Sequence, residues 1–231
     1  MKSVILFSLL AISLFSTAQE KKGNYMPIMT KGIGVSFQKF EALNSRIANY
    51  PQYASLKDHM WTLSVGSMHV KKNFISQFTI TGGSSMSGDR EKRSSALRFL
   101  SGGLDVGYDL IPSDKVMLYP LVGIGAEGYQ ALFYKDVSGV DFNDVLNSST
   151  VQNSIRSVRF SNAFITYRLG MGFALKSPKS SNTIGIQAGY TGNFKDRAWK
   201  SSENQTLAGA PVDNLSRFNI SLVFTGGMMM K

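Results

Sequence analysis

The chain contains no cysteine among its 231 residues. This absence excludes disulfide bonds, thiolate catalysis and cysteine-ligated metal sites. It also fits an exported protein whose fold is stabilised by packing and backbone pairing alone.

Long apolar runs are lacking after residue 19, because Gly, Ser or a charged residue interrupts the hydrophobic stretches every few residues. A transmembrane helix needs roughly 20 consecutive, mostly apolar residues. The sequence after residue 19 therefore predicts no spanning helix. If the protein lies in a membrane, it must cross that membrane with strands.

The first residues have the pattern of a secretory signal peptide. A positive charge at Lys2 precedes the apolar run Val4–Phe15, and the small residues Ser16-Thr17-Ala18 follow. The run is shorter than the roughly 20 residues of a membrane anchor. We therefore expect a signal peptide over residues 1–18, a mature chain that starts at Gln19, and a polar N-terminal lead over residues 19–30.

Acidic residues are few, since 15 Asp and Glu against 25 Lys and Arg give a net charge of +10. Nucleic-acid-binding proteins place such charge along a helix or an aromatic-lined groove, whereas here the basic residues fall in predicted turns and loops. We expect no nucleic-acid partner. A basic loop surface suits the phosphates of a lipid leaflet, or serves solubility alone.

The sequence is rich in alternating apolar and small polar residues, a pattern typical of strands with two unlike faces. The alternation is clearest over residues 97–133, where two such segments flank a turn at residues 111–115. Leu104 and Val106 lie on the apolar face of the first segment and Asp105 on its polar face. This hairpin predicts one face toward lipid and one small, polar face.

Eight strands are predicted, and their connections alternate in length. The strands are 33–38, 60–70, 74–83, 100–110, 118–127, 162–173, 184–191 and 217–224. The long connections are 41–59, 84–96, 135–157 and 195–214, and the short turns are 71–73, 111–115 and 176–181. Helical spacing in the first long connection predicts a short helix that ends by Pro51. Long loops at one end and short turns at the other are the layout of bacterial transmembrane barrels.

With this layout the chain resembles the small eight-stranded outer-membrane barrels of the OmpA and OmpX type, from about Lys31 to Phe224. The resemblance implies an all-β fold: an eight-stranded antiparallel transmembrane β-barrel with three short periplasmic turns and four long extracellular loops. It also implies location in the bacterial outer membrane and an aromatic residue at the end of the last strand. Phe224 supplies that residue, although residues 225–231 follow it. We assign residues 31–226 to the barrel.

A soluble barrel of the lipocalin type is the rival fold, since it would turn the apolar face inward. A water-facing exterior normally carries many charged residues, whereas the polar faces here are mostly Gly, Ser, Thr and Asn. Aromatic residues recur on the apolar face, as the girdles of membrane barrels require. They are Trp61, Tyr108, Tyr167 and Tyr190. The pattern favours the membrane barrel.

Four charged residues have the parity of the lumenal face: Asp105, Asp109, Glu127 and Arg168. The interior of an eight-stranded barrel is just wide enough for side chains to fill, and an isolated ion there is costly. We therefore predict a lumen charge cluster in which Glu127 or Asp105 neutralises Arg168 and which plugs the lumen. The alternative is that each charge lies in water near a barrel mouth.

Two further motifs have ordinary explanations. Residues Gly123–Gly128 match the G-x-G-x-x-G of dinucleotide-binding folds, but no helix follows, and alternate glycines suit a crowded barrel interior. Carboxylate and amide oxygens in the third long loop suit calcium, but the spacing lacks the glycine and final Glu of a helix–loop–helix site. These residues are Asp136, Asp141, Asn143 and Asp144. We expect no metal and no cofactor.

The function predicted from the sequence is non-enzymatic. We expect a monomeric barrel with a structural or surface-interaction role, whose loops contact outer-membrane lipid, lipopolysaccharide or an external partner. Two alternatives remain open. One is a lipid A-modifying hydrolase that uses His59 or His69 with a serine and an acid, although a surface position is the ordinary role of either histidine. The other is a narrow conduit for small hydrophobic compounds.

Overall fold

The computed structural model describes residues 28–89, 92–111, 113–177, 182–201 and 203–227. The predicted signal peptide, the start at Gln19 and residues 19–27 of the predicted lead lie outside the described residues, as does the tail from residue 228. No helix within the described ranges is long and apolar enough to cross a bilayer.

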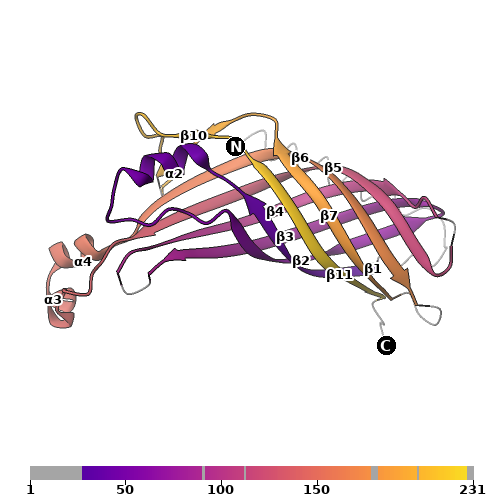
Figure 1. Ribbon diagram of the computed structural model, residues 1–231, viewed down its shortest axis with the longest axis horizontal. Helices are drawn as coiled ribbons and strands as arrows, with labels where there is room; N and C mark the ends of the chain where they lie inside the picture. Colours follow the sequence, from indigo (N-terminus) through magenta and orange to yellow (C-terminus); the bar gives the residue numbers. More distant parts are fainter. Residues whose placement is uncertain (1–27, 90–91, 112, 178–181, 202, 228–231) are drawn as a thin grey trace.

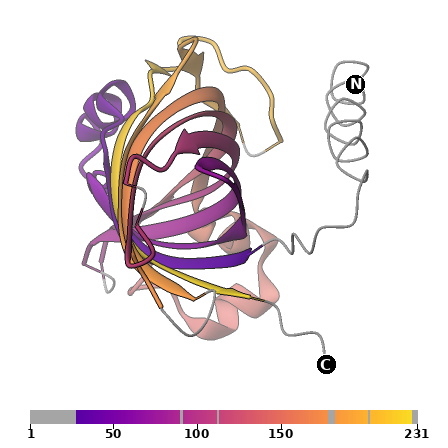
Figure 2. The same cartoon turned by 90° about the vertical axis from the view of Figure 1, so that its right-hand side faces the viewer.

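Long antiparallel strands form most of the fold. They are β1 (Ile28–Gln38), β2 (His59–Lys71), β3 (Phe74–Gly88), β4 (Ser94–Tyr108), β5 (Val116–Tyr134), β6 (Val158–Lys176), β7 (Thr183–Asn193) and β11 (Ser216–Gly227). Each of these eight strands pairs with two others, because β1 pairs with β11 and β5 pairs with β6. The sheet therefore closes into a barrel, which Figure 2 shows along its long axis. The predicted eight-stranded antiparallel barrel is confirmed.

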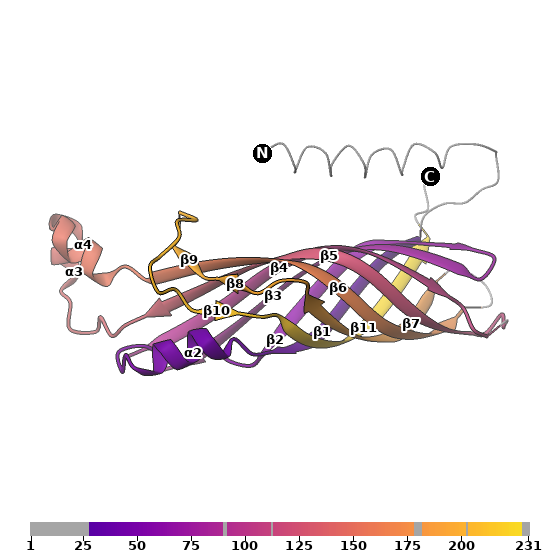
Figure 3. The same ribbon diagram turned by 90° about the horizontal axis from the view of Figure 1, so that it is seen from above.

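The two ends of the barrel differ (Figures 1 and 3). The connections β2–β3, β4–β5 and β6–β7 lie at one end, which we call the turn end. The opposite end, which we call the loop end, carries the remaining elements. These are α2 (Glu41–Ala48), α3 (Phe142–Asn147), α4 (Ser149–Ile155), β8 (Arg197–Ala198), β9 (Lys200–Ser201) and β10 (Val212–Asp213). The helix predicted before Pro51 is confirmed as α2.

The prediction of one of the four long loops is wrong. The sequence predicts a loop over residues 84–96, but β3 continues to Gly88 and β4 starts at Ser94, with Ser85 paired to Leu97. Backbone hydrogen bonds do not require alternating side chains, so a polar segment can extend the sheet. Ser94, Ser95 and Ala96 are buried at the start of β4. Three long connections remain at the loop end.

The alternation places apolar side chains outside and the predicted charges inside. Four residues assigned to the lipid face are between 42% and 56% exposed: Leu104, Ile124, Ile165 and Ile186. Asp105, next to Leu104 on β4, and Glu127, of opposite parity to Ile124 on β5, are buried. The face assignment made from the sequence is therefore confirmed.

The interior has three layers rather than one polar lining. An aromatic cluster fills the loop end: Phe40, Leu43, Ile47, Leu56, Met60, Leu97, Phe99, Tyr129, Ala131, Phe133, Phe164, Trp199 and Leu215. A second apolar cluster fills the turn end: Met68, Ile75, Met117, Tyr119, Leu121 and Ala174. Polar and charged side chains lie between them. The predicted small, polar inner face is thus right only for the middle, because strand parity separates two faces without saying what fills each level of the lumen.

Candidate functional site

The buried charges of the interior form ion pairs at successive levels. The pair nearest the aromatic cluster joins Arg217 on β11 to Glu127 on β5. Arg217 Nη2 lies 2.5 Å from Glu127 Oε1, and its Nε donates to Oε2 at 3.2 Å. The Tyr129 hydroxyl also donates to Oε2, at 2.8 Å, and the Phe99 ring centroid lies 4.8 Å from the guanidinium carbon. This two-point contact compensates the burial of both charges.

The second pair joins Arg168 on β6 to Asp105 on β4, with Nη1 and Oδ2 3.2 Å apart. Two glycines make room for it. A Cβ at Gly103 would collide with the Arg168 guanidinium, and one at Gly123 would collide with the Asp105 carboxylate. Gly123 is also the first glycine of the G-x-G-x-x-G match. Its lack of a side chain leaves space for this ion pair rather than for a nucleotide phosphate.

The third pair, at the turn end, joins Lys176 to Asp109, with Nζ and Oδ2 3.1 Å apart. Asp109 Oδ1 also accepts backbone N–H groups of Ile111 and Leu118, each at 3.2 Å. Lys176 Nζ donates to the Ser113 carbonyl at 2.8 Å. This pair therefore fastens the β4–β5 turn to the end of β6.

The four predicted lumenal charges are thus divided among three ion pairs. Arg168 contacts Asp105, which is one of its two predicted partners. The sequence reasoning missed Arg217 and Lys176 as partners. Arg217 has lumenal parity on the last strand, which was a usable signal, but only barrel closure places β11 across the lumen from Glu127.

Little space remains in the middle of the lumen. Gln187 on β7 donates to Gln77 on β3 at 3.3 Å, so side chains bridge the interior. A cavity bordered by Asp105, Arg168 and Gln187 measures about 30 Å³, roughly the volume that one water molecule occupies in the liquid. These contacts and the apolar clusters at both ends fill much of the lumen that the described residues enclose.

The first loop, between β1 and β2, and the last loop, between β7 and β11, contact each other at the mouth of the barrel. Phe40, just before α2, packs its ring 5.0 Å from Tyr129 and 5.2 Å from Trp199. Asp213 on β10 accepts the backbone N–H groups of Ala42 and Leu43 at 2.9 and 3.1 Å. It also accepts Trp199 Nε1–H at 2.8 Å. One buried carboxylate thus caps the helix, which favours negative charge at its N-terminus, and anchors the last loop.

The loop between β5 and β6, which we call the third loop, contains the helices α3 and α4 and projects farthest from the barrel (Figure 1). Asp141 caps α3 by accepting the Asn143 N–H at 2.8 Å, and Ser148 caps α4. Phe142 is 74% exposed and Leu146 63%. Because they are four residues apart on one helix, the two side chains lie on the same face. The loop therefore has its own local structure and displays apolar side chains to solvent.

Two of the four candidate calcium ligands of this loop, Asp136 and Asp141, serve local structure. Asp136 accepts the hydroxyl and the backbone N–H of Ser138 at 2.7 and 2.9 Å. These hydrogen bonds lower the pKa of the Asp136 carboxyl. Asp141 is engaged as the helix cap. Within the described ranges, no group of three or more His, Asp and Glu side chains could hold a metal ion.

The two histidines lie at opposite ends of β2, His59 at the loop end and His69 near the turn end. At about 3.3 Å per residue they are roughly 30 Å apart. They share the parity of Trp61, which is exposed on the outer face of the barrel. They therefore cannot act in one site, and neither faces the lumen.

The exterior identifies the class of protein. Apolar side chains cover the outer face, with exposed aromatic residues toward both ends, such as Trp61 and Tyr190 near the loop end and Tyr108 near the turn end. A closed antiparallel barrel satisfies all backbone groups in lipid, and short turns at one end with longer loops at the other are the layout of bacterial outer-membrane barrels. The chain is a β-barrel of the bacterial outer membrane.

Comparisons with known proteins found similarity among solved structures. No protein-family model matches the chain, and no curated protein matches it. Among solved structures, Ail, the attachment invasion locus protein of Yersinia pestis, is similar at 11% identity over 88% of this chain and 99% of that one, with a TM-score of 0.48. Neisserial surface protein A is similar at 11% identity over 87% and 97%, with a TM-score of 0.49.

A major outer membrane protein from Thermus thermophilus is similar at 11% identity over 86% of this chain and 98% of that one, with a TM-score of 0.49. The assignment to the barrel class rests on the strand pairing and the apolar exterior of this chain itself.

Proposed function

We propose that the protein is a non-enzymatic surface protein, in which a sealed barrel serves as a rigid base for loops that contact a partner outside the cell. The observation that carries the proposal is the third loop, where capped helices display Phe142 and Leu146 beyond the barrel. Ordered loops on a rigid scaffold are typical positions for binding residues. Apolar side chains of this size gain free energy when a partner removes them from water.

The filled interior supports the same proposal. Ion pairs and apolar clusters lie at successive levels of the lumen within the described residues, which favours a barrel without a continuous aqueous path. Purified protein in planar lipid bilayers should show no steady conductance. Stable, ion-selective open channels would favour the conduit instead.

The loop role is tested with bacteria that display the protein. The double variant Phe142→Ser/Leu146→Ser should reduce the adherence of these cells to one another or to protein-coated surfaces. A matched control, Leu207→Ser/Val212→Ser, changes two exposed apolar residues of the last loop and should retain adherence. Equal adherence of both variants and the unmodified protein would contradict the proposal.

Lipid analysis separates the surface role from a hydrolase. Expression of the protein should leave the acylation of lipid A unchanged, and so should the variants His59→Ala and His69→Ala. An acyl chain that is lost on expression and restored by either substitution would identify an enzyme.

A further inference from the structure

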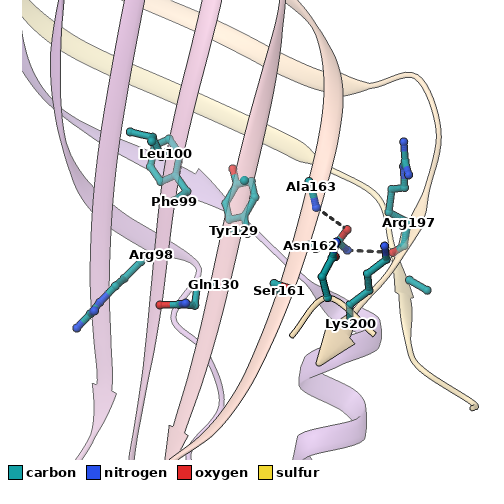
Figure 4. A pocket seen from close by; sticks show the side chains of 13 residues that line it. Arg98, Phe99, Leu100, Tyr129, Gln130, Ser161, Asn162, Ala163, Arg197 and Lys200 are labelled. Atoms are coloured by element: carbon teal, nitrogen blue, oxygen red, sulfur yellow. Dashed lines mark hydrogen bonds between the residues drawn. The ribbon is translucent and has the colours of Figure 1, made fainter. Parts of the chain in front are cut away.

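A pocket of about 470 Å³ lies on the outer surface of β4, β5 and β6, near the loop end (Figure 4). Leu100 and Ala163 line it and are exposed. The side chains of the adjacent Phe99 and Tyr129 belong to the aromatic cluster inside the barrel. Because neighbouring residues of a strand face opposite sides, the pocket opens to the outside of the barrel and not to the lumen.

Polar residues form a row across this surface. Arg98 on β4 pairs with Gln130 on β5, Gln130 with Ser161 on β6, and Ser161 with Lys200 on β9. Adjacent strands are about 4.8 Å apart, so the row spans roughly 14 Å between its end residues. Arg197 on β8 also lines the pocket. Figure 4 shows Arg98 at one side of the pocket and Arg197 and Lys200 at the other.

The positive charge of this pocket has no counter-charge among the described residues that line it. The residues that line it include Arg98, Arg197 and Lys200 but no Asp or Glu. None of these three basic residues forms an ion pair with another described residue. The pocket therefore offers an anionic ligand basic residues on both sides, Arg98 on one and Arg197 with Lys200 on the other, and Gln130 and Ser161 lie between them.

The row also marks the outer boundary of the apolar surface. In the next row toward the turn end, Leu100, Gly128 and Ala163 lie opposite one another, and Gly102, Ala126 and Ile165 follow. A Cβ at Gly128 would meet no atom within 4 Å. The surface below the basic row is therefore both apolar and recessed, and it continues into the part of the barrel that faces lipid.

We propose that this pocket binds the phosphorylated headgroup of an anionic lipid of the outer leaflet. The proposal deepens the proposed function, because it rests on the loop end lying on the outer side of the membrane. Arg98, Arg197 and Lys200 bind phosphate, for which arginine supplies a matching pair of donors. One acyl chain of the same lipid packs in the recess beside Leu100. Charge at the headgroup level combined with a recess at the chain level selects a lipid over a soluble anion.

The test measures lipid retained by the purified, folded barrel in detergent micelles, with native mass spectrometry as the readout. Diphosphorylated lipid A is the probe, and the same lipid without its phosphates is the comparison. The variant Arg98→Gln/Arg197→Gln/Lys200→Gln should retain the phosphorylated probe about 100-fold less, because each of the three basic contacts near a lipid surface contributes a factor of about five. A control variant removes the same charge from exposed loop residues outside the pocket, namely Lys57, Lys135 and Arg156, each changed to Gln.

A second variant tests the recess without changing charge. Gly128→Leu should fold, because its side chain enters open space, and it should weaken retention of the probe by occupying the position of the acyl chain. Folding of every variant is checked by the difference in electrophoretic mobility between heated and unheated samples.

The proposal is overturned if the site and control variants retain equal amounts of probe, or if the dephosphorylated lipid is retained equally well. Displacement of the probe by excess inorganic phosphate would identify a phosphate site and would also overturn it. Retention is measured without cells, so its failure leaves the adherence experiment unaffected. Likewise, loss of the loop role would leave lipid retention unchanged.

Discussion

The substitution Arg217→Met removes one partner of the most deeply buried ion pair while keeping a side chain of similar length. The Arg217 and Glu127 side chains are 5% and 2% exposed. After the substitution, the Glu127 carboxylate stays buried with only the Tyr129 hydroxyl as a partner. Breaking a buried pair in this way costs about 3–5 kcal/mol of unfolding free energy. The contact of Arg217 with the Phe99 ring adds a further loss of about 0.5–1 kcal/mol.

The double variant Glu127→Leu/Arg217→Met should be far less destabilised than the sum of the two single substitutions. It leaves no uncompensated charge, and its apolar side chains lie next to the aromatic cluster. The interaction free energy from the double-mutant cycle should therefore be large, at about 2 kcal/mol or more.

The measurement is equilibrium urea unfolding in phospholipid vesicles, followed by tryptophan fluorescence, to which the exposed Trp61 and the buried Trp199 both contribute. The exposed pair Lys39–Asp58 is the matched control, with the two charged atoms 3.8 Å apart and side chains 65% and 53% exposed. Its removal by Lys39→Met should cost less than about 1 kcal/mol. The reasoning would be refuted if Arg217→Met were no more destabilising than Lys39→Met, or if the two substitutions of the cycle were additive.

Three further predictions concern the lipid-facing exterior, the contact that Asp213 makes between the first and last loops, and the signal peptide. Ile124→Arg should cost about 2–4 kcal/mol in the same assay if it lies near the bilayer midplane, whereas Leu146→Arg at the loop tip should cost almost nothing; equal costs would contradict the face assignment. Asp213→Ala should expose Trp199, so that in a Trp61→Phe background its emission shifts to the red. The lost helix cap should cost about 0.5–2 kcal/mol of unfolding free energy. An unchanged spectrum would show that the contact between the two loops does not depend on this carboxylate. Mass spectrometry should give a mature chain that starts at Gln19 and fractionates with outer membranes, and recovery as a soluble periplasmic protein would contradict the prediction.

The fold could be predicted from the sequence because a strand with one face in lipid must alternate, and the alternation survives over many residues. Leu104 and Asp105 are assigned to opposite faces by parity alone, and the structure agrees. The pairing of Arg168 with Asp105 could also be predicted from the sequence. The two residues have the same parity on strands separated by one other strand, and a buried charge requires a partner.

The sequence-based prediction failed where apolar and polar residues do not alternate. Residues 84–96 lack that alternation, yet much of this segment forms strand, because backbone pairing does not depend on it. The helices α3 and α4 are short and are stabilised by local caps at Asp141 and Ser148. Such local hydrogen bonds leave little periodic signal in the sequence.

The sequence by itself determined which side chains face lipid and which face the lumen, because that division repeats every two residues along each strand. Only the tertiary structure decided which lumenal groups meet. Closure of the barrel brings Arg217 of the last strand to Glu127 and aligns Arg98, Gln130, Ser161 and Lys200 in one row. These contacts depend on strand register and stagger around the barrel, and no short-range pattern in the sequence specifies either.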